Sequence, residues 1–422
     1  MESTLYTINQ KRLLQTLAVS SSIGPSKNGG LHRLALTEQD REMRDQLKKW
    51  FVEAGLSVRV DDFGNMYGRR TGKQEEGPVL AMGSHMDSQP SGGKFDGVLG
   101  VLTALEVIRT LNELGLETEY PIEIVNFTNE EGARFGPPML GSGGIAEAFS
   151  KEYIYNIKDK EGTSFAEALR QIEYKGEEQN RLTNLLGFIE LHIEQGPILA
   201  KENVDIGIVE GVQGMSWLNV EVKGESNHAG PTPMEDRKDA LLSASKMISK
   251  INELHKEIKG LKTTVGQLDV YPNVPNVIPG SVSFSVDIRH EKDEVRKHAV
   301  ERMKEQLSTM AFTNNADVVI QTTWNSDAVT FSNHMKEYME QSAAARGYSS
   351  KRLFSGPGHD AKYIRHMAPA GMIFLPSQHG QSHNEKELTL EEDIEKGANV
   401  LLDVILKCTK QKIENIEVRN ID

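Results

Sequence analysis

The chain has 422 residues, of which 38% are hydrophobic and 26% charged, and its formal net charge is −13. This composition is typical of a folded globular protein, and the length is enough for two domains. The acidic balance and the absence of a basic stripe argue against nucleic-acid binding, and no apolar run reaches the ~18 residues that a membrane span requires.

Cysteine usage and the N-terminal sequence bear on the cellular compartment. Cys408 is the only cysteine, so no disulfide can form within the chain, and a reducing, cytoplasmic location is expected. Residues 1–15 are polar and show no secretory signal. Cys408 lies in an apolar stretch, which favours a buried thiol over a nucleophile.

The first half of the chain alternates strand and helix patterns. Short apolar runs predict strands at 78–83, 122–127 and 187–193, and residues 97–114 carry apolar side chains at helical spacing. Buried strands that alternate with helices indicate an α/β domain with a largely parallel sheet.

The pattern changes after about residue 207. It predicts strand 215–224, helix 237–258, strands 262–271 and 281–289, helix 292–311 and strand 316–323. This β-α-β-β-α-β order is that of a split βαβ sandwich, which would form a separate lid or dimerisation module.

The helix and strand rhythm returns after about residue 328, with a strand at 371–376 and a helix at 390–407. We therefore expect a discontinuous first domain, 1–208 with 328–422, and an inserted domain, 209–327. The polar residues 413–422 are expected to fray.

The first chemistry-bearing segment follows strand 78–83. His85 is a candidate metal ligand, and Asp87 is a candidate for the carboxylate that fixes its tautomer. Asp96 follows two glycines and precedes the long helix. It could bind metal or serve as the helix N-cap, a common role of Asp.

The second segment contains Glu130 and Glu131, directly after strand 122–127. Adjacent carboxylates at a strand end are costly unless cations or a proton separate their charges. One could bind metal while the other acts as general base towards water, although two solvated glutamates would look the same in the sequence.

The third and fourth segments supply histidines. His192 lies in the strand at 187–193, where a satisfied core histidine is the alternative interpretation. His383 follows the strand at 371–376, and His379 competes with it. Together the four segments place three histidines and two carboxylates at strand ends, a mixed N/O set that suits zinc, manganese or cobalt in a two-metal site.

Seven stretches in this order resemble the carbamoylase/hydantoinase-type amidase family of the zinc-aminopeptidase-like superfamily. They are GSHMDSQPSGGKFDGVLGV, NEEGARF with a later MLGS, ELHIEQGPIL, NHAGPTPMEDRKDA, PNVIPGSVSFSVDIR, GPGHDA and PSQHGQSHNEKE. The resemblance implies a zinc-aminopeptidase-like catalytic domain with a mixed, largely parallel sheet, and an inserted ferredoxin-like α+β domain that forms a homodimer.

The resemblance also implies two divalent ions per subunit, with zinc expected and manganese, cobalt or nickel as substitutes. One ion would be bound by His85 and His192, the other by Glu131 and His383, and Asp96 would bridge them. Glu130 would be the general base, with Asp87 as the orienting residue.

Further residues match the family's substrate contacts. His228 would polarise the substrate carbonyl, and Asn276 and Arg289 would hold a substrate carboxylate. Gln195, Gly358 and His359 match other residues on the substrate side of the pocket.

The implied activity is hydrolysis of the N-carbamoyl (ureido) group of N-carbamoyl-L-amino acids or N-carbamoyl-β-alanine, which releases ammonia, carbon dioxide and the amino acid. The alternatives are allantoate amidohydrolysis, or dipeptidase or deacylase activity at the same site. The expected partners are a small ureido carboxylate and a second copy of the chain, with no nucleic acid and no membrane.

Overall fold

The computed structural model describes residues 5–313 and 315–409, and the polar stretch 413–422 lies outside them. Contacts divide the chain into two compact units. The first runs to Glu210 and resumes at Phe331, and the second is Gly211–Thr330. Among the described residues, no helix combines the length and the hydrophobicity needed to cross a bilayer.

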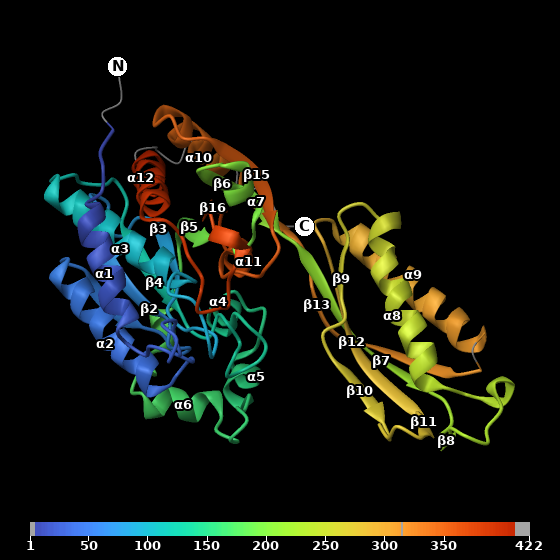
Figure 1. Cartoon of the computed structure of the whole chain (residues 1–422). Helices are drawn as coiled ribbons and strands as arrows, with labels where there is room; N and C mark the ends of the chain where they lie inside the picture. The colour runs from blue at the N-terminus through green and yellow to red at the C-terminus, as the bar shows by residue number, and fades with distance from the viewer. Residues whose placement is uncertain (1–4, 314, 410–422) are drawn as a thin grey trace. The chain divides into compact units, whose positions relative to one another are not determined.

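The first unit is a mixed sheet with helices packed against it (Figure 1). Its strands are β1 (Ser57–Val60), β2 (Met66–Arg70), β3 (Val79–His85), β4 (Ile122–Phe127), β5 (Leu185–Ile193), β6 (Ile206–Val212), β15 (Ser350–Ser355) and β16 (Ala370–Leu375). Its helices are α1 (Gln10–Ser21), α2 (Glu38–Glu53), α3 (Val98–Glu113), α4 (Leu140–Ile145), α5 (Lys151–Asn156), α6 (Phe165–Gln171), α7 (Ile198–Glu202), α10 (Asn333–Ala345), α11 (Ala361–Ile364) and α12 (Glu391–Cys408), with 3-10 turns η1 (Glu178–Asn180) and η3 (Gln378–Gly380).

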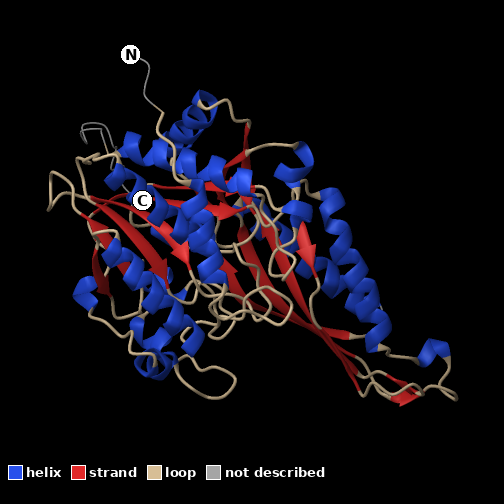
Figure 2. Ribbon diagram, turned by 60° about the vertical axis from the view of Figure 1, so that its left-hand side comes forward, coloured by secondary structure: helices blue, strands red, loops and turns tan. Residues whose placement is uncertain are grey.

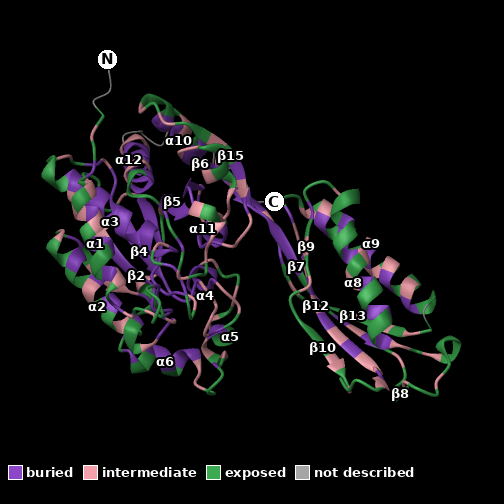
Figure 3. Ribbon diagram, viewed as in Figure 1, coloured by how far each residue is buried: buried purple, intermediate pink, exposed green. Residues whose placement is uncertain are grey.

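The sheet order is β1-β2-β4-β3-β5-β16-β6, with β15 also paired to β6. The four central strands β4, β3, β5 and β16 are parallel to one another, whereas β1, β2 and β6 pair antiparallel. Every residue of β3, β4 and β16 is buried, because helices cover both faces of a parallel sheet (Figures 2 and 3). The predicted α/β class with a mixed, partly parallel sheet is confirmed.

The second unit follows the predicted β-α-β-β-α-β order in its main elements, with the second strand divided into β9 and β10 and with short strands added. Its elements are β7 (Gly214–Lys223), β8 (Asn227–His228), η2 (Met234–Asp236), α8 (Ala240–Glu257), β9 (Lys262–Thr264), β10 (Leu268–Tyr271), β11 (Val277–Ile278), β12 (Ser281–His290), α9 (Asp293–Thr313), β13 (Asp317–Ser326) and β14 (Val329–Thr330), of which β14 pairs with the end of β6. The main sheet runs β10-β12-β7-β13, and β9 also pairs with β12.

Burial alternates along β12, so one face of this sheet packs against the two helices and the other stays partly open (Figure 3). Val282, Phe284, Val286 and Ile288 join the hydrophobic cluster beneath α8 and α9. Arg289, the residue after Ile288, therefore lies on the open face.

The strand predicted at 262–271 is wrong as one element, because it is divided into β9 and β10 at residues 265–267. Both pieces pair with β12, at Asp287–Arg289 and Ser281–Phe284 respectively. The interruption coincides with Gly266, a residue that weakens a strand interior and often marks an irregularity.

Candidate metal centre

The candidate site is formed where the parallel strands of the first unit end. His85 is the last residue of β3, and Glu130 and Glu131 follow β4 within four residues. His192 is the penultimate residue of β5, and His383 lies in the loop after β16. Since carboxyl ends of parallel strands share one edge of a sheet, segments far apart in sequence meet here.

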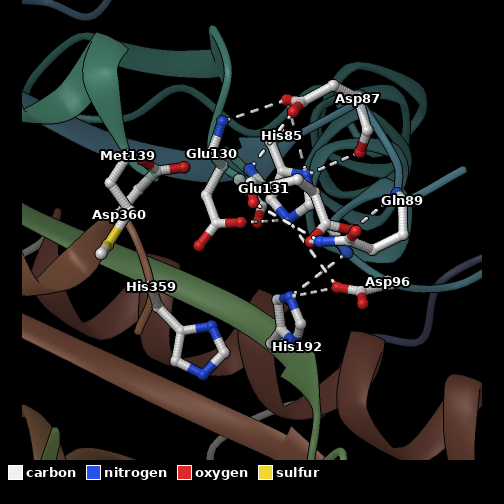
Figure 4. Close-up of polar contacts among 12 residues, drawn as sticks. His85, Asp87, Gln89, Asp96, Glu130, Glu131, Met139, His192, His359 and Asp360 are labelled. Atoms are coloured by element: carbon white, nitrogen blue, oxygen red, sulfur yellow. Dashed lines mark hydrogen bonds and ion pairs between the residues drawn. The ribbon is translucent and has the colours of Figure 1, made fainter. Parts of the chain in front are cut away.

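Among the described residues, three groups of donor atoms could hold an ion, and two of them share Asp96, one with His85 and His192 and the other with Glu131 and His383. The third group is Glu190, His192 and His359. Figure 4 shows His85, Asp96, Glu131 and His192 close together. Oδ1 of Asp96 lies 3.7 Å from Nε2 of His85 and 3.3 Å from Nε2 of His192. Oδ2 of Asp96 lies 3.4 Å from Nε2 of His383, which is also 3.2 Å from Oε2 of Glu131. Within each group the ligand atoms lie within 4.8 Å of one another.

Two alternatives from the sequence are resolved by this geometry. The N-cap of α3 is Gly97, which makes no side-chain cap hydrogen bond, so Asp96 is not the cap. Gly97 has φ +66°, and a Cβ there would lie 2.3 Å from the His85 ring, so the close approach requires glycine. Among the described residues, the groups that could hold an ion include His383 and not His379.

The buried carboxylates of the site favour the binding of positive charge. Burial, with Asp360 and Glu131 nearby, raises the pKa of Glu130 well above its usual range. Hydrogen bonds to Asp96 and Glu131 raise the pKa of His383 to about 11. Buried carboxylates this close together need cations or protons between them, and the mixed N/O donors suit divalent metal ions. The residues present therefore fit a pair of such ions.

Asp87 acts differently from the expectation that its carboxylate orients His85. Nδ1 of His85 lies 2.9 Å from the backbone oxygen of Asp87 but 3.8 Å from its carboxylate. The two carboxylate oxygens instead accept hydrogen bonds from the backbone N–H groups of Glu130 and Glu131, each at 3.2 Å. Asp87 thus ties the loop after β3 to the loop after β4.

Glu130 belongs to neither donor group, which leaves its carboxylate available for proton transfer. Its Oε2 lies 3.4 Å from Nε2 of His85. Its backbone oxygen accepts a hydrogen bond of 2.8 Å from the N–H of Met139, so its main chain is held on both sides (Figure 4).

Three expected substrate-side residues line the same region. The side-chain amide of Gln195 donates to Oδ2 of Asp96 at 2.9 Å, and its Oε1 is buried without a hydrogen-bond partner among the described residues. The His359 ring packs edge-on against His192, with centroids 4.5 Å apart, and is only 1% exposed. A Cβ on Gly358 would lie 2.7 Å from the Met139 side chain, so Gly358 allows a close approach.

Sequence reasoning missed several buried polar residues that support the site. The Arg33 side chain donates to the backbone oxygen of Met86 at 2.7 Å and to those of Ser20 and Ile23, which holds the loop that carries His85. Glu190, Asp360 and Glu387 are also buried. Glu190 carried a periodic signal, since it lies two residues before His192 and so on the same face of β5. Asp360 and Glu387 lie in the stretches GPGHDA and PSQHGQSHNEKE, but the resemblance gave them no role.

His228 and Asn276 lie side by side in the second unit. Both are exposed, and β8 pairs with β11 so that the Ala229 N–H donates to the Asn276 backbone oxygen at 3.0 Å. Nδ1 of His228 accepts from the Gly230 N–H at 3.0 Å. In the neutral tautomer that this contact favours, the His228 ring carries its proton on Nε2, so that Nε2–H can donate a hydrogen bond.

The structure does not bring Arg289 to Asn276. Arg289 pairs with the carboxylate of Asp287, with its Nε 2.9 Å from Oδ2. It lies eight residues along β12 from Ser281, the end of the strand near β11, which is a separation of about 26 Å. One small carboxylate cannot contact both residues of the same chain, so the joint role expected for them needs correction.

The comparisons with known proteins show the family of the chain. The sequence model of peptidase family M20/M25/M40 matches residues 81–407. An N-carbamoyl-L-amino-acid amidohydrolase of Rhizobium meliloti is 40% identical over 401 residues, covering 95% of this chain and 96% of that protein. An allantoate amidohydrolase of Bacillus subtilis (strain 168) is 35% identical over 409 residues, 93% and 98% of the two chains.

Among solved structures, a hydantoinase/carbamoylase family amidase from Burkholderia multivorans has a TM-score of 0.91, 41% identity and coverage of 96% and 99% of the two chains. The fold, the site and these relatives define the class, a hydrolase that acts on C–N bonds. The chain belongs to peptidase family M20/M25/M40. The resemblance to carbamoylase/hydantoinase-type amidases that the sequence motifs indicated is confirmed.

Proposed function

We propose that this chain is a two-metal amidohydrolase that removes the N-carbamoyl group from N-carbamoyl-L-α-amino acids or N-carbamoyl-β-alanine. The observation that carries the proposal is the sharing of Asp96 between two donor groups, with the carboxylate of Glu130 beside them and outside both. The names of the relatives support the substrate class.

Each residue of the proposed site has its own role in the reaction. His85, His192, Asp96, Glu131 and His383 would hold two divalent ions, with zinc expected and manganese, cobalt or nickel as substitutes. Such ions would supply Lewis-acid charge and acidify water. Glu130 takes a proton from the attacking water as the new C–O bond forms. His228, through Nε2–H, stabilises the developing oxyanion.

Bond breaking completes the reaction. Glu130 returns the proton to the leaving nitrogen, and the C–N bond breaks. This step releases the free amino acid and carbamic acid, and carbamic acid then decomposes to ammonia and carbon dioxide. Gln195, Gly358 and His359 would form the part of the pocket next to the donor groups.

Assembly and location belong to the same proposal. We expect a cytoplasmic homodimer that forms through the inserted unit. Arg289 lies about 26 Å along β12 from Ser281, the strand end that follows β11 and is nearest in sequence to Asn276. A single substrate molecule would therefore receive the contacts of Arg289 and of the pair His228 and Asn276 from two different chains.

The substrate assignment is tested by ammonia release. Purified protein is incubated with N-carbamoyl-α-amino acids, N-carbamoyl-β-alanine, allantoate and dipeptides. We expect ammonia from one of the N-carbamoyl amino acids at the highest kcat/KM. Faster turnover of allantoate would favour the activity named in the Bacillus subtilis relative. Dipeptide cleavage without ammonia would contradict the proposal.

Arg289→Ala is expected to raise the KM for carboxylate-bearing substrates about 10- to 100-fold, with a smaller change in kcat. The reason is the loss of a charge-assisted hydrogen bond, typically worth ~1.5–3 kcal/mol. Steady-state kinetics measures this effect. Arg302→Ala is the matched control, since Arg302 is an ion-paired arginine of the same unit. An unchanged KM in Arg289→Ala would remove Arg289 from the pocket.

A further inference from the structure

Glu387 is a buried carboxylate that the proposed reaction does not use. It lies four residues after His383, in the loop between β16 and α12, and is only 6% exposed. Burying a carboxylate is costly unless hydrogen bonds compensate for lost water. The groups that provide those hydrogen bonds therefore indicate what Glu387 does.

The Glu387 carboxylate binds the segment that carries Asp96. Its Oε1 accepts hydrogen bonds from two consecutive backbone N–H groups, of Phe95 at 3.0 Å and of Asp96 at 3.1 Å. Two adjacent N–H groups on one oxygen fix the orientation of the peptide between them. The contact joins loops almost 300 positions apart in the sequence.

The second oxygen extends this contact to the Asp96 side chain. Oε2 of Glu387 lies 2.9 Å from Oγ of Ser382, and the Gln195 amide lies 3.1 Å from the same Oγ and 2.9 Å from Oδ2 of Asp96. The two amide hydrogens can go to Asp96 and Ser382. The Ser382 hydroxyl can then donate to Oε2 of Glu387 at 2.9 Å or to Oδ2 of Asp96 at 3.2 Å. Backbone and side chain of Asp96 are thus held by one network.

Gly93 leaves room for the Glu387 carboxylate to approach the segment that carries Asp96. A Cβ on Gly93 would lie 1.9 Å from Oε1 and 2.0 Å from Cδ of Glu387. Any side chain at position 93 would therefore push the carboxylate away from the Asp96 segment. This gives a second way to break the contact without changing Glu387.

The two donor groups differ in how they are anchored. His85 and His192 lie on β3 and β5, whose positions the strand pairing determines. His383 lies on a loop, and Asp96 lies on the segment before α3. The side chain of His383 is 48% exposed, whereas those of His85 and His192 are 1% exposed.

We propose that Glu387 is a positioning residue that holds Asp96 at a set separation from His383, and so completes the metal subsite of Asp96, Glu131 and His383. This inference rests on the proposed two-metal function. Asp96 belongs to both subsites. Loss of Glu387 would weaken the subsite that contains His383 more than the other, because His383 lies on an exposed loop, whereas His85 and His192 are held on buried strands.

The test measures how much zinc the metal-free full-length protein binds. Binding is measured by equilibrium dialysis with metal analysis. We expect wild type to bind two zinc ions per chain. Glu387→Ala should weaken the second dissociation constant about 10- to 100-fold, the usual cost of losing a residue that orients a metal ligand. The first dissociation constant should stay within about threefold. Glu387→Gln should show a smaller effect in the same direction.

Three further variants separate positioning from general destabilisation. Gly93→Ala should reproduce the selective loss, since it displaces the same carboxylate from the other side. Glu385→Ala is the matched control, because Glu385 lies in the same loop and accepts a hydrogen bond from Ser26 instead. It should bind both ions as wild type does. His383→Ala should lose the same ion that Glu387→Ala binds more weakly.

The outcomes distinguish this inference from the proposed function. Two tightly bound ions in wild type, Glu387→Ala and Gly93→Ala would overturn the role of Glu387 and leave the two-metal centre intact. Equal weakening of both subsites, together with a lower unfolding temperature of the metal-free variant, would show a purely structural role. Fewer than two ions in wild type would overturn the two-metal centre, and this inference with it.

Discussion

Glu130→Gln is expected to lower kcat by about 10³-fold or more while zinc binding stays at the wild-type level. Glutamine has the same shape but cannot take a proton from water, and general base catalysis contributes typically 10²–10⁴-fold. Metal binding should persist, because Glu130 belongs to neither donor group. Steady-state kinetics and metal analysis on the same preparation measure both effects.

The control for this variant is Glu117→Gln, which removes a carboxylate from an exposed position and should leave kcat unchanged. Near-native turnover by Glu130→Gln would mean that another group takes the proton. A fall in bound zinc that accounts for the whole loss of activity would instead move Glu130 into the ligand set.

Removal of metal is expected to abolish activity and to lower stability. Dialysis against a strong chelator should leave less than about 1% of the activity, and added zinc should restore it, because the proposed Lewis-acid charge is then missing. The metal-free state also keeps buried carboxylates close together without cations. Zinc at 1,000 times its dissociation constant should stabilise the fold by about 4 kcal/mol, seen as a higher unfolding midpoint.

A parallel dialysis against the same chelator already saturated with zinc controls for direct effects of the chelator. Protein shown by elemental analysis to be free of metal, yet fully active, would contradict the two-metal proposal. An unfolding midpoint that does not respond to zinc would contradict binding at a preformed site.

Much of the first unit could be predicted because its central strands β3, β4 and β16 are buried along their whole length. The largely apolar runs of β3 and β4 end at His85 and shortly before Glu130. The sequence therefore shows both that these segments are strands and where each strand ends. Parallel strands bring their carboxyl ends to one edge, and this places the predicted ligand segments near one another. The family motifs then suggested how the donors are shared.

The supporting residues could not be predicted in the same way. Arg33 and Glu387 follow no helical or strand period, and their partners, Met86 and Asp96, are distant in sequence. The division of residues 262–271 was missed because two strands on the same partner look like one apolar-polar pattern. Only the pairing with β12 shows the break.

The sequence by itself determined the element types, the residues at the strand ends and the family, because these depend on local periodicity and on side-chain chemistry. Only the tertiary structure decided that the Asp87 carboxylate binds the main chain of Glu130 and Glu131, and that Arg289 and Asn276 lie far apart. The physical reason is that a sequence pattern predicts which face of an element, or which strand end, a side chain occupies. Its hydrogen-bond partners depend on loop paths, and contacts between distant segments set those paths.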